Sequence, residues 1–173
     1  MPFNFENLNP LTRQIMKHEL EYDQENKKLY ISLRLNERGV QLYPRLLQKA
    51  IDEGNEATLT NELKSQDCFN TYEIKNGELI NRKVPYNAAE TLSEGEFNRF
   101  YIRALCLRAI KEGCKLEVYR AKEVSDPRSE SQKKIGLVIN AETLLNDLRN
   151  NIGINTAFGL PNGPNSGLSM KIK

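Results

Sequence analysis

The chain has 173 residues, of which 39 % are hydrophobic and 28 % charged, a length and composition typical of one globular domain with extended ends. Its 25 Lys and Arg against 23 Asp and Glu leave a formal net charge of +2. That balance argues against a protein that binds nucleic acid through a strongly basic face, although it leaves room for a local basic patch.

The N-terminal part predicts an extended arm, a helix and a strand. Residues 1–10 contain three Asn and two Pro, which favours an extended arm. Apolar side chains at steps of three and four residues then predict an amphipathic helix over 10–22. The segment LYISLRL, residues 29–35, alternates apolar and polar side chains as a strand does. The apolar stripe of the predicted helix consists of Leu11, Ile15, His18 and Tyr22, with His18 expected at the edge of the core.

Two further helices and a hairpin are expected next. Apolar spacing predicts a helix from residue 40 to Gly54 and a shorter one over 55–65. The clearest hairpin of the chain is CFNTYEIKNGELINRKVPY, residues 68–86. Its Asn76-Gly77 pair supplies the positive φ angles of a tight turn between two β-rich runs.

The segment TLSEGEF predicts the start of a long helix. Ser93 is the expected N-cap, and Glu96 three residues later completes a capping box. The helix is expected to run to Lys111 or Glu112, with Gly113 as the residue that ends it.

The rest of the chain predicts a strand over 114–124, a polar loop, a short strand IGLVI and a helix capped by Asn140. The last residues are rich in Gly, Asn and Pro, apart from a terminal strand LSMKIK. Helices and strands alternate without a strict βαβ rhythm, which favours an α+β fold with a small, mostly antiparallel sheet. We therefore expect an N-terminal arm over 1–10, one α+β domain over 11–152 and a C-terminal arm over 153–173.

The long helix carries three arginines on an otherwise apolar surface. A projection at 100° per residue leaves most of its circumference apolar, so we expect it to be packed on two sides. Arg108 falls near the middle of the apolar face, with Arg99 and Arg103 opposite. A buried guanidinium needs a carboxylate, so one interpretation is that Arg108 pairs with an acidic neighbour and orients the helix. The other is an anion or partner site, with binding residues Arg99, Arg103, Arg108, Arg120, Lys122 and Arg128.

The sequence supports a catalytic function less well than it supports a structural or binding role for the arginines. Glu117, Lys122 and Asp126 resemble the carboxylate–lysine sets of metal-dependent nucleases, but the residue two before the lysine is Arg120, not an acid. The alternative function is a nucleic-acid-processing enzyme that grips phosphate, with Glu117, Lys122 and Glu123 as catalytic residues. One histidine and three scattered cysteines predict no metal site, and the absence of Gly-rich phosphate motifs predicts no nucleotide cofactor.

The C-terminal segment offers apolar anchors between Gly-Pro-Asn turns. Two interpretations stay open: the tail folds back on its own domain, or it lies as an arm on a neighbouring subunit and adds a strand to an exposed sheet edge. The anchors are Leu160, Leu168, Met170 and Ile172.

Signals for export or membrane insertion are not expected. MPFNFENLNP lacks the basic and apolar regions of a signal peptide, and no apolar run approaches the ~20 residues that span a bilayer. Three cysteines without a disulfide pattern favour reduced thiols. The sequence therefore predicts a protein of the cytoplasm.

Three segments together resemble a widespread family of uncharacterised bacterial and prophage-encoded proteins: residues 82–113, 118–136 and 159–172. The part FNRFYIRALCLRAIKEG followed by VYRAK is also similar to a segment of some tailed-phage head-morphogenesis proteins. The resemblance carries no catalytic residue. It implies a non-enzymatic structural protein, capsid- or neck-associated in a phage or phage-derived particle, made in the bacterial cytoplasm. Its partners would be copies of itself or neighbouring structural proteins, with nucleic acid not favoured.

Overall fold

The computed structural model describes residues 1–153, 156, 158–160 and 166–173 of the chain. The described residues form six helices and two small antiparallel sheets, which confirms the predicted α+β class. The elements in chain order are α1 (Pro10–Glu25), α2 (Glu37–Glu53), α3 (Glu56–Ser65), β1 (Tyr72–Lys75), β2 (Glu78–Lys83), α4 (Ala88–Glu112), β3 (Leu116–Arg120), α5 (Ser129–Lys134), β4 (Val138–Ile139), α6 (Ala141–Asn150) and β5 (Leu168–Ile172).

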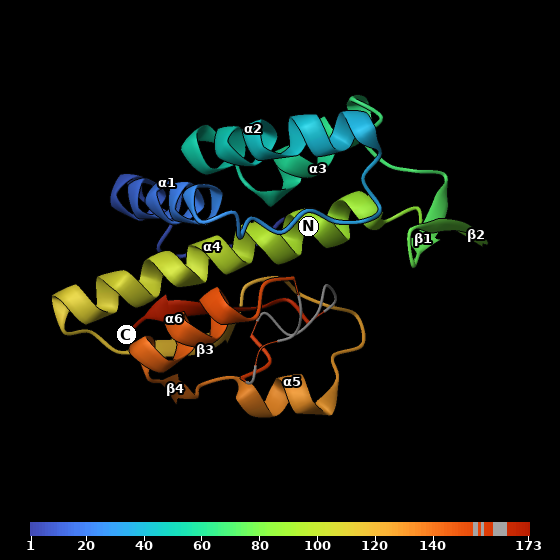
Figure 1. Cartoon of the computed structure of the whole chain (residues 1–173). Helices are drawn as coiled ribbons and strands as arrows, with labels where there is room; N and C mark the ends of the chain where they lie inside the picture. Colours follow the sequence, from blue (N-terminus) through green and yellow to red (C-terminus); the bar gives the residue numbers. More distant parts are fainter. Residues whose placement is uncertain (154–155, 157, 161–165) are drawn as a thin grey trace.

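Helix α4 is the central element of the fold. In Figure 1 it runs between a layer formed by α1, α2 and α3 and a second layer formed by α6 and the sheet that contains β3. Every residue from Glu96 to Cys106 is buried. A helix buried on all sides must lie between two layers, so the predicted packing of this helix on two sides is confirmed.

Of the two predicted ends of α4, the C-terminal end agrees with the structure and the N-terminal end does not. Gly113 follows the last turn with a left-handed φ of 70°, so the predicted stop is confirmed. The predicted start is wrong, because the helix begins at Ala88 and Ser93 lies inside it, fully buried. Ala88, Ala89 and Leu92 are buried as well. Packing of these residues extends the helix past a local capping signal.

The main sheet has the strand order β4-β3-β5, with β3 in the centre. Strand β5 pairs antiparallel with β3 over its whole length, from Leu168 opposite Arg120 to Ile172 opposite Leu116. In the single chain, the predicted terminal strand therefore completes its own domain's sheet. Of the predicted C-terminal arm over 153–173, residues 154, 155, 157 and 161–165 lie outside the described residues.

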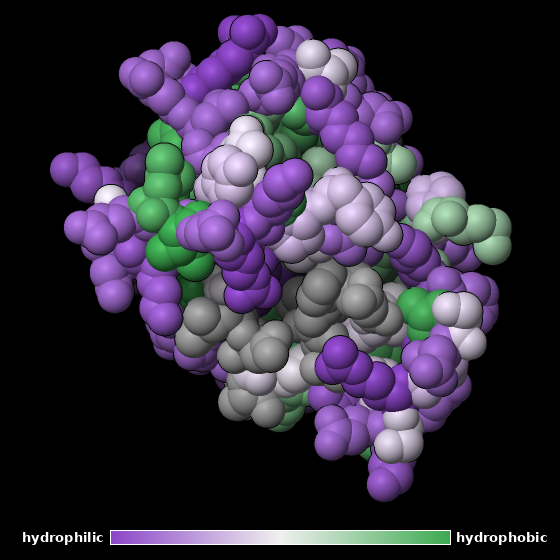
Figure 2. All heavy atoms as spheres, turned by 90° about the vertical axis from the view of Figure 1, so that its right-hand side faces the viewer, coloured by the Kyte–Doolittle hydropathy of each residue, from purple (hydrophilic) through white to green (hydrophobic). Residues whose placement is uncertain are grey.

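The second sheet is the hairpin of β1 and β2, which projects from the body at one end (Figure 1). Asn76 and Gly77 take φ angles of 51° and 79°, as the predicted tight turn requires. Figure 2 views the molecule from this end, where the surface is mostly hydrophilic and the apolar groups are small and separate.

The residues before α1 lie across the chain's own domain. Phe5 is buried, and its ring lies 4.7 Å from that of Tyr101. The N–H of Asn4 donates to the carbonyl of Ala121 at 2.7 Å, and the N–H of Asn7 donates to the Tyr101 hydroxyl at 3.0 Å. This extended segment therefore ties α4 to the end of β3.

Two local predictions are wrong. Residues 29–35 form no strand, because the carbonyl and hydroxyl of Ser32 accept the N–H groups of Leu35 and Arg34 and fold the segment into a turn. Leu35 makes only an isolated bridge with Phe69. The predicted polar loop contains α5, whose Glu, Gln and Lys residues favour a helix.

Candidate functional site

Arg103 on α4 forms a buried ion-pair network with α1. Its Nε donates to Glu19 Oε1 at 2.9 Å, and its two terminal nitrogens donate to the Asp23 carboxylate at 2.7 and 2.8 Å. The three side chains are only 3–4 % exposed. Burial lowers the pKa of Arg103, but hydrogen bonds and charges from Asp23 and Glu19 raise it above its ordinary value. The guanidinium therefore stays charged inside the protein.

Glu19 of α1 is bonded to α6 as well as to α4. Its two oxygens also accept hydrogen bonds from Nε and Nη2 of Arg149, at 2.9 and 2.8 Å. Burial alone would raise the pKa of Glu19, but Arg149 and Arg103 hold it below its ordinary value. One carboxylate thus joins α1, α4 and α6.

Arg99 is buried one turn earlier on α4. Its Nη2 donates to the backbone carbonyls of Leu148, at 3.3 Å, and of Asn151. These carbonyls belong to the C-terminal end of α6, where a cation is favoured by the helix dipole. Arg99 and Arg103, expected opposite the apolar face, are therefore buried under α6 and α1.

Arg108 pairs with an acidic neighbour as one interpretation predicted. Its Nε donates to Glu112 Oε1 at 3.1 Å, one turn along α4, and its Nη1 donates to Thr12 Oγ1 at 3.1 Å. Its side chain is 13 % exposed, so the guanidinium reaches the surface while its stem packs in the core.

The other three predicted binding residues lie near or beyond the end of β3. Arg120 donates from Nη1 to the carbonyl of Ser166 at 2.6 Å, while its buried Nη2 has no hydrogen-bond partner among the described residues. Lys122 donates to the Glu94 carboxylate. Arg128 is exposed just before α5. Of these six cations, five are engaged by groups of their own chain.

The residues of the catalytic alternative have separate partners. The Glu117 carboxylate accepts a hydrogen bond at 2.7 Å from the ammonium of Lys173, which follows the neighbouring strand β5, and this bond lowers the pKa of Glu117. Lys122 is held by Glu94, and Glu123 is exposed after β3. Within the described part of the chain, no group of three or more His, Cys, Asp or Glu is placed to hold a metal ion.

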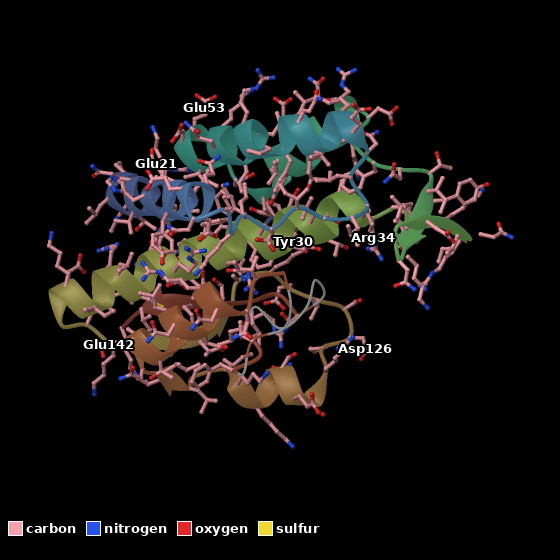
Figure 3. The ribbon with its side chains drawn as sticks, in the orientation of Figure 1. Glu21, Tyr30, Arg34, Glu53, Asp126 and Glu142 are labelled. Atoms are coloured by element: carbon pink, nitrogen blue, oxygen red, sulfur yellow. The ribbon has the colours of Figure 1, made fainter. Side chains whose placement is uncertain are left out.

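Glu96 is a titratable group that the sequence assigned to a helix cap and the structure places in the core. It is 7 % exposed. Burial raises its pKa to about 7, with Asp23 of α1 acting in the same direction and Arg99 and Arg103 acting against it. Tyr43 of α2 faces it with a buried hydroxyl that has no hydrogen-bond partner among the described residues. Figure 3 shows Tyr30, the other neighbour of that hydroxyl, beside the middle of α4.

We expect Glu96 to make stability depend on pH. A pKa of about 7 in the folded state against an ordinary 4.5 means that the folded protein holds this proton more tightly. The resulting stability is fully present below about pH 4.5 and is lost as the pH rises through about 7, by roughly 3 kcal/mol at most. Glu96→Gln should therefore unfold at higher urea than the wild type at pH 8, with little difference at pH 4. An exposed control, Glu78→Gln, should show no such gain; equal gains would contradict the assignment.

The apolar stripe of α1 faces outward, contrary to the expected position of His18. Leu11 is 46 % and Tyr22 is 38 % exposed, and His18 is exposed. The buried face consists instead of Thr12, Met16, Glu19, Leu20 and Asp23. The rotation has a physical reason, because Arg103 on α4 requires the carboxylates of that face.

Three residues of the stripe, Leu11, Ile15 and His18, lie on one side of an apolar groove whose other side is the C-terminal end of α4. Leu11, Gln14, Ile15 and His18 line it from α1, and Leu107, Arg108, Ile110, Lys111 and Glu112 from α4. Arg108, one of the six predicted binding residues, therefore lines this groove. The sequence predicted the apolar stripe, but the stripe was expected to face the core.

No protein-family model, curated protein or solved structure matches this chain. None of the described helices is long and apolar enough to cross a membrane.

Proposed function

We propose that this chain is a non-enzymatic structural or interaction protein of a larger assembly. The observation that carries the proposal is the position of its cations. Arg99 and Arg103 direct their donors to α6 and α1, and Lys122 directs its ammonium to Glu94. A protein that grips phosphate needs cations that are free to meet the ligand. Here they join the layers of the fold on either side of α4.

The assembly that the sequence resemblance suggests is a phage or phage-derived particle, with this chain at the capsid or neck. The partners are then protein subunits, either copies of the chain or neighbouring structural proteins. The apolar groove beside α1 supports this function, because exposed apolar surface rimmed by polar groups is typical of protein contacts.

Sedimentation of the chain in lysates of cells that encode it tests the proposal. We expect the tagged chain to sediment with particles many times larger than its own 19.9 kDa, and to remain there after nuclease treatment. A chain that sediments only as a monomer or dimer would contradict the proposal. Binding of a labelled duplex with a steep salt dependence would favour the enzymatic alternative with Glu117, Lys122 and Glu123.

A further inference from the structure

Glu96 on α4 is a buried carboxyl group that no described residue binds. It is 7 % exposed, and neither a hydrogen bond nor an ion pair joins it to another described residue. The hydroxyl of Tyr43 on α2, which faces it, is also without a hydrogen-bond partner among those residues. Because buried polar groups are nearly always hydrogen-bonded, an ionised Glu96 would gain from any donor that turns towards it.

Charged and titratable groups act at this place from α4 itself and from three other segments. They are Arg99 and Arg103 of α4, Asp23 of α1, Tyr43 of α2 and, beside the Tyr43 hydroxyl, Tyr30 of the segment between those two helices (Figure 3). Asp23 disfavours the ionised form of Glu96, whereas the two arginines favour it. Ionisation of Glu96 therefore depends on an arginine that can reach it.

Arg103 is not free to turn towards Glu96. It donates three hydrogen bonds to the carboxylates of Glu19 and Asp23. Turning away would leave the buried Asp23 carboxylate without its partner, at a cost of several kcal/mol. Arg103 should therefore stay on α1 whatever the charge of Glu96.

Arg99 bonds weaker acceptors and is a neighbour of Glu96 on the helix. Its Nη2 donates to the carbonyls of Leu148 and Asn151 at the end of α6. Residues three apart on a helix lie side by side, so the same guanidinium reaches Glu96 by a change of rotamer. A guanidinium binds an ionised carboxylate more strongly than a neutral carbonyl. Asp147 of α6 also attracts Arg99 and opposes the turn.

We propose that Glu96 and Arg99 form a proton-operated switch that controls the C-terminal end of α6. With Glu96 protonated, Arg99 holds the carbonyls of Leu148 and Asn151, as in the structure. When Glu96 releases its proton to water, Arg99 turns to the carboxylate, and the two carbonyls lose their donor. The last carbonyls of a helix have no N–H partner in the helix itself, so the end of α6 opens. The switch operates within one chain and does not depend on the proposed function.

The direction of the pH dependence follows from the burial of Glu96. Burial raises its pKa to about 7 in the closed form, and the bond to Arg99 lowers that pKa again in the open form. The closed form is therefore favoured below pH 7 and is lost as the pH rises through that value. A return of the pKa from about 7 to its ordinary 4.5 raises the ratio of open to closed form by about ten- to a hundredfold between pH 5 and pH 8.

Hydrogen exchange measured by NMR on the full chain tests the switch. The amides in the last turn of α6, residues 149–151, should lose protection by about ten- to a hundredfold from pH 5 to pH 8, after correction for the intrinsic exchange rate at each pH. Glu96→Gln keeps the shape of the side chain but cannot ionise. In this variant the same amides should keep their protection at both pH values.

The end of α2 is a matched control within the same chain. Arg13 Nη1 donates there to the carbonyls of Ala50 and Ile51, at 3.3 and 3.0 Å, as an arginine does on α6. The carboxylate that acts on Arg13 is that of Asp52. The amides in the last turn of α2, residues 52–54, should therefore keep their protection from pH 5 to pH 8.

Arg99→Lys is a second variant, which keeps the charge and removes the fork of donors. Its α6 end should be less protected than that of the wild type already at pH 5, and should change less with pH. Circular dichroism at both pH values verifies that each variant is folded.

Three results would overturn the inference. One is a wild-type α6 end that is equally protected at pH 5 and pH 8, which would mean that Glu96 acts only on the unfolding of the whole chain. The second is an equal loss of protection at the end of α2. The third is the same loss at the α6 end in Glu96→Gln, because another group would then be the one that titrates.

Discussion

Replacing Arg103 by Met is expected to lower the free energy of unfolding by about 3–5 kcal/mol. The substitution keeps the apolar stem but leaves the Asp23 carboxylate, 4 % exposed, without its ion-pair partner. Glu19 keeps Arg149. The cost should therefore arise mainly at Asp23, and urea unfolding followed by circular dichroism measures it.

Two further variants separate this cause from a loss of packing. Arg103→Met combined with Asp23→Asn should be more stable than Arg103→Met alone, because no unpaired charge remains at Asp23. Arg108→Met, at a more exposed pair with Glu112, should cost no more than about 1 kcal/mol. If the single change at Arg103 costs no more than that at Arg108, the buried network is not a major source of stability.

Deleting residues 168–173 is expected to abolish cooperative folding. The deletion removes β5, and with it the fully buried side chains of Leu168 and Met170. It also leaves β3 paired only with the two-residue strand β4. Losing each of two buried side chains costs about 2–5 kcal/mol, and the whole stability of a domain is only about 5–15 kcal/mol. Thermal unfolding and limited proteolysis measure the effect.

Two smaller changes at the same end of the chain serve as comparisons for this deletion. Met170→Ala should cost about 2–5 kcal/mol, whereas removing Lys173 alone, which is exposed and bonds the Glu117 carboxylate, should leave the unfolding temperature nearly unchanged. A shortened chain that still unfolds cooperatively at the same temperature would contradict the role of β5. If it folds but changes its oligomeric state, the result would support the predicted arm on a neighbouring subunit.

Elements with a strong local signal could be predicted from the sequence. The Asn76-Gly77 turn and the Gly113 stop both depend on backbone angles that few residues adopt. Asn140 caps α6 through a hydrogen bond from the N–H of Thr143, only three residues away. In each case the residues that decide the structure are neighbours in the sequence.

Features decided by distant residues could not be predicted. Nothing near Leu11 in the sequence shows that α1 turns its apolar stripe outward, since the cause is Arg103, 80 residues or more from its carboxylates. Glu96 has the spacing of a capping box, but burial of Ala88 and Ala89 moves the start of α4. The partners of Arg99 on α6 and of Arg103 on α1 could only come from the fold.

The sharing of Glu19 between Arg103 and Arg149 has an evolutionary consequence. A substitution at any one of positions 19, 23, 103 and 149 unbalances a set of two cations and two carboxylates, of which Glu19, Asp23 and Arg103 are buried. Drift from this charged set to an apolar one must therefore pass through disfavoured intermediates, or change several codons together. In descendants of this sequence the four positions should covary as a block, even where the surface around them diverges freely.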